Sequence, residues 1–335
     1  MKENTADVSA RPGTMSVFVR QIRFEGNGIN SYELVDAAGN ELPPFAPGAH
    51  IDVHLVGGAL RQYSLCNDPQ ERHRYVIAVL RDEGGRGGSK TLHETLRVQD
   101  FLSIGPPRNN FWLVPDAKKV ILLAGGIGVT PLKSMAHLLE REGIDYELHY
   151  CAKDLKFAAF AEEMVALSEK GRVHFHFDGG DPTRGLDIAK LLREPSTGTH
   201  LYYCGPGGFM KACAAASAHW PAGTVHFEHF KAPDTIEKGF PASDTGAEGG
   251  SFDVQIARSG QRIHVGADES LADALNKAGV PVETSCQSGL CGTCKIRYLT
   301  GQVDHRDFIL NDEEREEFLT ACVSRSTSDL LTLDL

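Results

Sequence analysis

The sequence lacks any long hydrophobic run and any export signal. No stretch approaches the roughly 18 consecutive apolar residues that a membrane helix needs. The start, MKENTADVSARPG, lacks the charged-then-apolar pattern of a secretory leader. We therefore expect a cytoplasmic protein that does not associate with membranes. In that reducing compartment, the eight cysteines are expected to be free thiols or metal ligands and not disulfides.

Positive charge is also scarce, and internal repeats are absent. The chain carries 34 Lys and Arg against 45 Asp and Glu, which gives a formal net charge of −11. This balance argues against nucleic-acid binding, because that function needs a basic surface. The 335 residues are enough for two or three domains, each with its own core.

The chain divides into four segments that differ in the spacing of their apolar and turn-forming residues. Residues 1–113 contain short β-like runs broken by Gly, Pro and Asn, which predict a small antiparallel β-barrel. Residues 114–230 alternate buried-strand and helix patterns from KKVILLAGG onward, and predict a doubly wound α/β domain with a parallel sheet. Residues 231–250 are rich in Gly, Pro, Ser and acidic residues and are expected to be an exposed linker. Residues 251–335 open with a hairpin pattern and a helix pattern.

Four cysteines near the end of the chain are spaced for an iron–sulfur cluster. The order is Cys286-x4-Cys291-x2-Cys294, followed by Cys322 after 27 intervening residues, which is the plant-type [2Fe–2S] spacing. The small residues between the first three ligands allow the backbone to curl around a cluster and to aim N–H groups at its sulfurs. Two alternatives remain open: four unrelated buried cysteines, and a zinc site, whose ligands usually come as two short pairs.

Residues 251–335 resemble a plant-type ferredoxin domain, including the segment GQVDHRDFILNDEERE before TACVSR. The resemblance implies an α+β, β-grasp-like fold. It also implies that the cluster ligands are Cys286, Cys291, Cys294 and Cys322.

Glycine-rich turns indicate a nucleotide site. In LLAGGIGVTPLKSM, Gly125, Gly126 and Gly128 lie between a strand and a helix, where the backbone can approach a pyrophosphate at the helix N-terminus. The G-x-G-x-x-G pattern is incomplete, because Pro131 stands at its last position. In YYCGPGGFM, a second turn that begins with Gly205 and Pro206 opens another helix. A purely structural turn remains the alternative for the first motif.

Together, GGIGVTPL and CGPGGF resemble the pyridine-nucleotide domain of the ferredoxin–NADP reductase superfamily. The resemblance implies that Thr130 and Cys204 lie near the nicotinamide, and a small core residue is the alternative for Cys204. After the strand YELHYC, Lys153 favours the 2′-phosphate of NADPH, whereas Asp154 favours the free ribose hydroxyl of NADH. The resemblance favours NADH, and NADPH stays open.

A flavin is needed between a hydride donor and a one-electron cluster, because it accepts a hydride and releases electrons singly. RQYSL matches the R-x-Y-S motif of the same superfamily. By that resemblance Arg61 binds phosphate, Tyr63 packs on the isoalloxazine and Ser64 hydrogen-bonds near N5. An ordinary β-strand with one aromatic residue is the alternative.

Two more segments belong to the expected flavin site. One is a strand that lines the flavin, and the other is a phosphate-cradling turn ahead of a helical stretch. Their residues are Ala78, Val79 and Leu80 in the strand, and Gly87, Gly88, Ser89 and Lys90 in the turn. The chain leaves little room for a loop that holds an adenine, so FMN is favoured over FAD.

The segment HFEHF ends the nucleotide domain. The resemblance implies that Phe230 closes on the flavin ring, as the terminal aromatic of the family does. A hydrophobic anchor for the linker is the alternative. Glu228 is a candidate for a position facing the nicotinamide.

Across the whole chain, the order of these motifs resembles the reductase components of Rieske oxygenase systems, a group that includes phthalate dioxygenase reductase and the vanillate demethylase reductases. The resemblance implies a relay from NADH through FMN and a [2Fe–2S] cluster to a Rieske-type partner oxygenase. Ser64, Thr130 and Cys204 would serve the hydride step. A stand-alone NAD(P)H reductase of flavin or ferric iron and a redox-sensing iron–sulfur protein are the alternatives.

The last segment is acidic, which suggests how the partner is recognised. Residues 251–335 carry eight Lys and Arg against fourteen Asp and Glu, so an acidic carrier is expected to meet a basic patch on the oxygenase. The run DEEREE, residues 312–317, is a candidate surface, with a solvated helix face as its alternative. A monomer is expected.

Overall fold

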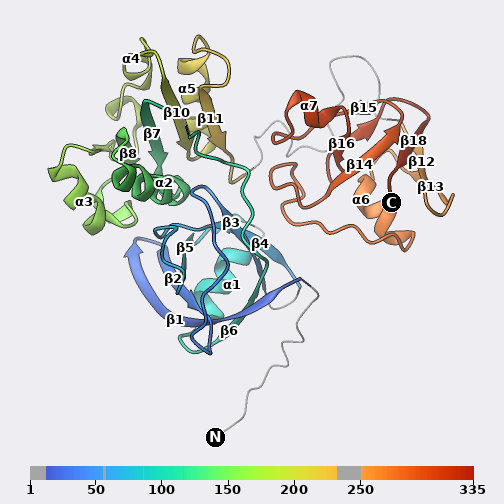
Figure 1. The fold of residues 1–335 in the computed structure, drawn as a ribbon, viewed down its shortest axis with the longest axis horizontal. Coiled ribbons are helices and arrows are strands. Elements are labelled where there is room, and N and C mark those ends of the chain that lie inside the picture. The colour runs from blue at the N-terminus through green and yellow to red at the C-terminus, as the bar shows by residue number, and fades with distance from the viewer. Residues whose placement is uncertain (1–12, 56–57, 86, 116, 232–249) are drawn as a thin grey trace, which may run out of the picture. The chain divides into compact units, whose positions relative to one another are not determined.

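The computed structural model describes residues 13–55, 58–85, 87–115, 117–231 and 250–335. The chain divides into two compact units, Met1–Phe230 and Lys231–Leu335 (Figure 1). The linker expected at residues 231–250 lies outside the described residues except at its two ends. No helix in the described part of the chain is both long enough and apolar enough to cross a membrane.

A curled antiparallel sheet forms the first part of the larger unit. Its short strands alternate inward apolar and outward polar residues, which is the pattern of a sheet with one face on a core. The edge strands β4 and β5 meet through a bridge between Leu65 and Ile77, so the sheet closes towards a barrel. In the order β4-β3-β6-β1-β2-β5, the sheet consists of β1 (Met15–Gly26), β2 (Ile29–Val35), β3 (His50–His54), β4 (Leu60–Ser64), β5 (Tyr75–Leu80) and β6 (Phe101–Ile104), with α1 (Gly88–Thr95) between β5 and β6.

A parallel sheet with helices on both faces forms the second part of this unit. Its strands lie in the order β11-β10-β7-β8-β9, and every neighbouring pair is parallel. The elements are β7 (Lys119–Gly125), η1 (Gly126–Gly128), α2 (Val129–Glu142), β8 (Asp145–Ala152), η2 (Leu155–Phe157), α3 (Ala161–Glu169), β9 (Val173–Phe177), η3 (Pro182–Arg184), α4 (Ile188–Leu191), β10 (Thr199–Cys204), α5 (Gly207–Ser217) and β11 (Val225–Glu228).

The central strand β7 explains how this sheet is covered. Its run KVILLAG is apolar at every position after Lys119, as a strand buried on both faces requires. Val120 and Leu122 join the core under α2 and α3, whereas Ile121 and Leu123 join the core under α4 and α5. The chain returns from β9 to the other side of β7, so the strand order reverses between β7 and β10. Ligands of such sheets bind at this switch point.

The smaller unit is a mixed five-stranded sheet with one main helix. Its strands lie in the order β13-β12-β18-β14-β16, with β12 and β18 parallel. The side chain of Ser270 caps α6 by accepting a hydrogen bond from the N–H of Asp273. The elements are β12 (Phe252–Ile256), β13 (Arg262–Val265), α6 (Leu271–Lys277), β14 (Lys295–Thr300), β15 (Val303–Asp304), α7 (Asp312–Arg315), β16 (Phe318–Thr320), β17 (Arg325–Ser326) and β18 (Leu330–Leu333). The barrel, the parallel sheet and this α+β unit are the three architectures that the sequence predicted.

Candidate functional site

The predicted flavin strands meet at the seam of the barrel. Ser64 and Ala78 are the residues next to the Leu65–Ile77 bridge on β4 and β5. Ser64, Ala78 and Val79 are buried, whereas Leu80 is 41% exposed at the end of its strand. The structure therefore brings together the two segments that sequence reasoning assigned to one flavin site.

The side chain of Arg61 lies against the N-terminus of α1. A Cβ placed on Gly88 would lie 2.5 Å from Arg61 Nε, so the arginine side chain lies directly against the first residue of the helix. Gly87 precedes it at φ 82°, a left-handed conformation that favours glycine, and no side chain caps the helix. Backbone N–H groups, the helix dipole and a guanidinium at one place suit a flavin phosphate. Ser89 is already engaged, because its hydroxyl accepts the N–H of Asp82 at 3.0 Å.

Tyr63 is the aromatic residue of the seam. It is partly exposed on β4, and desolvation raises the pKa of its phenol well above the usual value. The side chain is therefore neutral at physiological pH, as a residue that packs on a flavin ring should be.

The two glycine turns of the parallel sheet touch each other. A Cβ on Gly128 would lie 2.2 Å from the carbonyl oxygen of Cys204, and a Cβ on Gly205 would lie 3.0 Å from Gly125 Cα. A Cβ on Gly125 would also lie 2.9 Å from Pro206 Cδ. Only glycine permits this approach, and it joins the β7–α2 and β10–α5 turns at the switch point of the sheet. Gly126 supplies the remaining turn residue at φ 54°.

The first turn of α2 contains two of the predicted nucleotide residues, Thr130 and Pro131. Pro131 lies in the first turn, where its missing N–H costs nothing. Thr130 is buried, and its hydroxyl donates to the carbonyl oxygen of Ile127 at 3.0 Å. That bond fixes the side chain, and the lone pairs of the hydroxyl are left to accept a further hydrogen bond.

Cys204 and Glu228 form a buried pair that sequence reasoning only half found. They are directly paired at the ends of β10 and β11. Cys204 is fully buried, and its pKa is raised by burial and then by the neighbouring Glu228. Burial raises the pKa of Glu228 to about 8, and its Oε2 is buried without a hydrogen-bond partner among the described residues. The residue as a whole is only half-buried, but the carboxyl oxygen Oε2 is itself withdrawn from solvent. The available signal was an acidic residue inside the apolar segment HFEHF.

Asp154 lies in the turn after β8. Its carboxylate accepts the N–H of Lys156 at 2.9 Å and contacts Lys156 Nζ at 3.4 Å. The barrel holds this turn, because the N–H of Asn27 donates to the Lys156 carbonyl oxygen at 2.7 Å. Lys153 lies over the ring of Phe157. Asp154 and Lys153, which favour NADH and NADPH respectively, therefore lie in the same turn.

Phe230 is the last residue of the larger unit. Its side chain is 42% exposed. An exposed aromatic ring of this size is available to cover a ligand.

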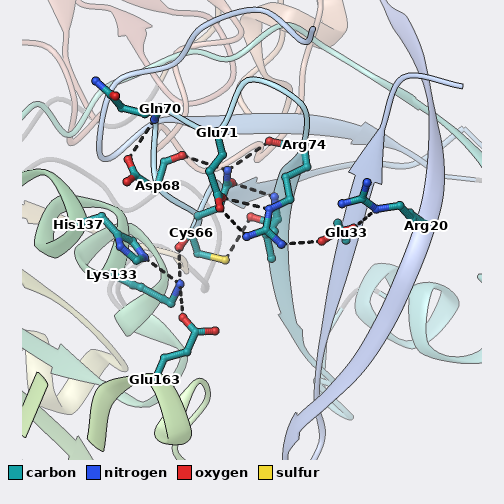
Figure 2. A network of polar contacts seen from close by, with 12 residues as sticks. Arg20, Glu33, Cys66, Asp68, Gln70, Glu71, Arg74, Lys133, His137 and Glu163 are labelled. Atoms are coloured by element: carbon teal, nitrogen blue, oxygen red, sulfur yellow. Dashed lines mark hydrogen bonds and ion pairs between the residues drawn. The ribbon is translucent and has the colours of Figure 1, made fainter. Parts of the chain in front are cut away.

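Lys133 links the flavin strand region to the nucleotide helix (Figure 2). Its ammonium donates to the carbonyl oxygen of Cys66 at 3.1 Å, contacts His137 Nε2 at 3.1 Å and pairs with Glu163 at 2.8 Å. Cys66 lies two residues after Ser64, and Lys133 lies three residues after Thr130. The buried cation therefore fixes the two predicted halves of the hydride site relative to each other, and sequence reasoning missed it.

A polar cavity of about 190 Å³ borders this network, and Glu33, Asn67, Arg74, Lys133 and Glu163 are among its lining residues. None of the residues predicted to bind flavin or nucleotide lines it. Figure 2 shows several of its charged lining residues in ion pairs, Glu33 with Arg74 and Lys133 with Glu163 among them. This cavity therefore belongs to a network of ion pairs that stabilises the larger unit.

The four predicted cluster ligands converge in the smaller unit. The Cys286 thiol lies near those of Cys291 and Cys322, and the Cys294 thiol lies near that of Cys322. These mutual contacts lower the pKa of Cys286 and Cys294 and raise the pKa of Cys291 and Cys322. The backbone N–H groups of Leu290 and Ser288 donate to Cys286 Sγ at 3.3 and 3.4 Å, and the N–H of Cys322 donates to Cys294 Sγ at 3.4 Å. N–H donors at sulfur stabilise a thiolate, which is the form that binds iron.

The backbone between the ligands has the conformation that a cluster loop needs. Gln287, Gly289 and Gly292 have positive φ angles of 54°, 67° and 71°. A Cβ on Gly289 would lie 2.8 Å from Val323 Cγ2. The close approach and the N–H groups aimed at sulfur fit a [2Fe–2S] cluster on these four residues. The other thiols lie elsewhere: Cys66, Cys151, Cys204 and Cys213 all belong to the parallel-sheet or barrel segments.

The acidic run at residues 312–317 has structural partners. Asn311 and Glu314 form a reciprocal capping box at the start of α7. Glu314 pairs with Lys295 at 2.7 Å, and Glu317 pairs with Arg297 at 3.1 Å. Part of the charge is thus neutralised within the unit.

Comparisons with known proteins agree with this arrangement. The 2Fe-2S iron-sulfur cluster binding domain family matches residues 254–327. The chain is 55% identical to the tert-butanol monooxygenase / tert-amyl alcohol desaturase reductase subunit of Aquincola tertiaricarbonis, over 96% of each chain. It is 43% identical to a vanillate O-demethylase oxidoreductase of Pseudomonas sp. (strain HR199 / DSM 7063), over 96% of this chain and 100% of the relative.

A solved structure is also similar over nearly the full length. It is described as phthalate dioxygenase reductase, a modular structure for electron transfer from pyridine nucleotides to [2Fe–2S]. The TM-score is 0.70 at 40% identity, and the match covers 96% of this chain and 98% of the other. The chain therefore belongs to the family of modular flavin and iron–sulfur oxidoreductases that serve as reductase components of oxygenase systems, together with phthalate dioxygenase reductase and the vanillate O-demethylase oxidoreductases.

Proposed function

We propose that this protein takes electron pairs from NADH and delivers them singly to a Rieske-type oxygenase. One observation carries the proposal: a single chain contains all three predicted sites. They are the barrel seam at Leu65 and Ile77, the two touching glycine turns of the parallel sheet, and the four neighbouring thiols of the smaller unit. Family membership supports FMN, NADH and a [2Fe–2S] cluster as the working set.

Three groups of residues would hold the cofactors and NADH. Around FMN we place Arg61, Gly87, Gly88 and Ser89 at the phosphate, and Tyr63, Ser64, Ala78, Val79, Leu80 and Phe230 at the ring. Around NADH we place Gly125, Gly126, Gly128, Pro131, Gly205 and Pro206 at the pyrophosphate, Asp154 at the adenosine ribose, and Thr130 and Cys204 at the nicotinamide. At the cluster we place Cys286, Cys291, Cys294 and Cys322.

The protein residues bind, orient and exclude water. A bound flavin accepts a hydride and releases electrons one at a time, which a one-electron cluster can take up. Ser64 would orient the flavin edge from the seam, and Thr130 would accept a hydrogen bond from the substrate carboxamide. Cys204 and the buried oxygen of Glu228 would line the nicotinamide side of the site and keep water from it, which limits side reactions with water.

The relatives support a proposal for the partner. The tert-butanol monooxygenase relative is a reductase subunit, so an oxygenase is the partner that we propose here. We further propose that this oxygenase is of the Rieske type, that the reductase is a cytoplasmic monomer, and that residues 1–113, 114–230 and 251–335 are its FMN, NADH and ferredoxin domains.

Anaerobic titration with NADH tests the relay. The purified protein should bleach its flavin and cluster absorbance together, and the reduced cluster should give an EPR signal. A cluster that stays EPR-silent while the flavin is reduced would contradict the proposal and leave a stand-alone flavin reductase. NADPH serves as the comparison, and a strong preference for it would overturn the assignment of Asp154.

A second measurement tests the partner. Stopped-flow mixing of the NADH-reduced protein with a purified Rieske-type oxygenase from the same organism should reduce the oxygenase's own iron–sulfur centre. If cytochrome c is reduced rapidly but that centre is not, the proposed partner class is wrong.

A further inference from the structure

A cluster of metal-binding side chains lies on the parallel sheet, away from the flavin seam and the cysteine loop. Glu147 and His149 are on β8, and His174 is on β9, where it pairs directly with His149. Alternate residues of a strand share a face, so all three side chains are on the same side of the sheet. Leu123 on β7 pairs with His149 and belongs to the core under α4 and α5, which places the cluster on that face.

The three side chains converge. One ligand atom from each of Glu147, His149 and His174 lies within 4.8 Å of the other two. Glu147 Oε2 is 3.4 Å from His149 Nε2. Two ligands of a tetrahedral zinc ion, each at about 2.0–2.1 Å, lie about 3.3 Å apart. The observed separation is therefore close to an edge of such a site.

His149 Nε2 is the buried nitrogen of the cluster. The side chain is 8% exposed, and Nε2 makes no hydrogen bond among the described residues, although Glu147 Oε2 lies 3.4 Å away. Burying a polar atom without a hydrogen bond is unfavourable, and a bound ion would satisfy it.

The remaining atoms of these ligands are held by neighbours, as in metal sites. His149 Nδ1 is 3.0 Å from His176 Nε2, which suits an Nδ1–H donor and leaves Nε2 as the coordinating nitrogen. The other oxygen of Glu147, Oε1, accepts from Lys119 Nζ at 2.7 Å. The ring of His149 also stacks with the rings of His174 and His176 on β9, at 4.9 Å and 5.2 Å between ring centres, which restricts its orientation.

We propose that Glu147, His149 and His174 form a site for one divalent transition-metal ion of the zinc class. Two imidazoles and one carboxylate are a common ligand set for Zn²⁺ with a position left for water, and imidazole nitrogen selects Zn²⁺, Ni²⁺ or Cu²⁺ over Mg²⁺ and Ca²⁺. Because β9 is an edge strand with β8 as its neighbour, the ion would tie the edge of the sheet to its interior.

Equilibrium dialysis of the tag-free holoprotein against Zn²⁺ tests the proposal, with iron content checked so that the cysteines stay occupied. The wild type should bind one equivalent of zinc beyond its iron, and 1 mM Mg²⁺ should not displace it. Glu147→Gln and His174→Gln should each weaken zinc binding at least about tenfold. Zinc should also raise the Tm of the wild type and not that of the two variants.

The opposite edge of the same sheet offers a matched control. His200 and His226 on β10 and β11 form a similar stacked pair, with Nδ1 and Nε2 3.1 Å apart, and no third ligand accompanies them among the described residues. His200→Gln should keep wild-type zinc binding. The proposal is overturned if the wild type binds no zinc, or if both Glu147→Gln and His174→Gln bind zinc as tightly as the wild type.

Discussion

At the scale of single residues, Glu228 makes folding depend on pH. Its pKa is raised from 4.5 to about 8, so between these values the folded state holds a proton that the unfolded state has lost. This contribution is complete below pH 4.5 and is lost as the pH rises through 8. In Glu228→Gln, Tm should fall less between pH 6 and pH 9 than in the wild type. Each kcal/mol corresponds to about 2–4 °C in a unit of this size.

The measurement is thermal unfolding of the NADH-free holoprotein across that pH range. Glu142→Gln, at an exposed position in the last turn of α2, is the control and should keep the wild-type slope. Equal slopes in the wild type and Glu228→Gln would show that this carboxyl is ionised in the folded protein at neutral pH.

At the scale of elements, the contact between the β7–α2 and β10–α5 turns rests on Gly128. In Gly128→Ala the new Cβ would lie 2.2 Å from the Cys204 carbonyl oxygen, and backbone cannot move aside cheaply. We expect a loss of about 1–3 kcal/mol of stability and a KM for NADH raised roughly tenfold, with FMN still bound. NADH–ferricyanide kinetics and flavin content would measure both effects.

Gly208→Ala is the matched control on the second of these turns. Nothing lies within 4 Å of a Cβ at Gly208, and the residue is in α5, where alanine is favoured by about 1 kcal/mol over glycine. This variant should equal or exceed the wild type in stability. If Gly128→Ala keeps both the wild-type KM and Tm, then the close packing of the two turns is not what shapes the nucleotide site.

At the scale of the whole molecule, the residues proposed for hydride acceptance and those proposed for single-electron delivery lie in different compact units. Cys291→Ser would remove one of the four proposed cluster ligands in the smaller unit, and it leaves the barrel and the parallel sheet untouched. NADH–ferricyanide activity should stay near the wild-type level, and NADH–cytochrome c activity should fall by about tenfold or more. Cys213→Ala, which removes a buried thiol from α5, should retain both activities. Retained cytochrome c reduction in Cys291→Ser would contradict the order of the relay.

Much of the fold was predictable because its signals are local. The apolar run of β7, the cysteine spacing before β14 and the short alternating strands of the barrel each occupy a few neighbouring residues. The candidate site residues were found in the same way, from short motifs that carry Arg61, Gly128 or Cys291. Their convergence in the structure supports the motif assignments, and their individual roles stay predictions.

What the sequence pattern missed depends on residues that are distant along the chain. The sequence gives no sign that Lys133 differs from other helix positions, because its partner, the carbonyl oxygen of Cys66, is distant along the chain. The sequence offered Glu228 as a candidate near the nicotinamide, but not its pairing with Cys204, which β10 and β11 bring about. His149 and His174 belong to separate strands, and nothing local to either predicts that they face each other.

The sequence by itself determined the order of the three architectures, the spacing of the four thiols proposed for the cluster and the glycines of both turns. Each of these follows from spacing along the chain, where one residue's conformation and chemistry limit its neighbours. Only the tertiary structure decided which motifs touch: the seam at Leu65 and Ile77, the approach of Gly128 to Cys204 and the histidine face of β8 and β9. Strand order and register are set by packing of whole faces against a common core, and that free energy is summed over residues that no short pattern contains.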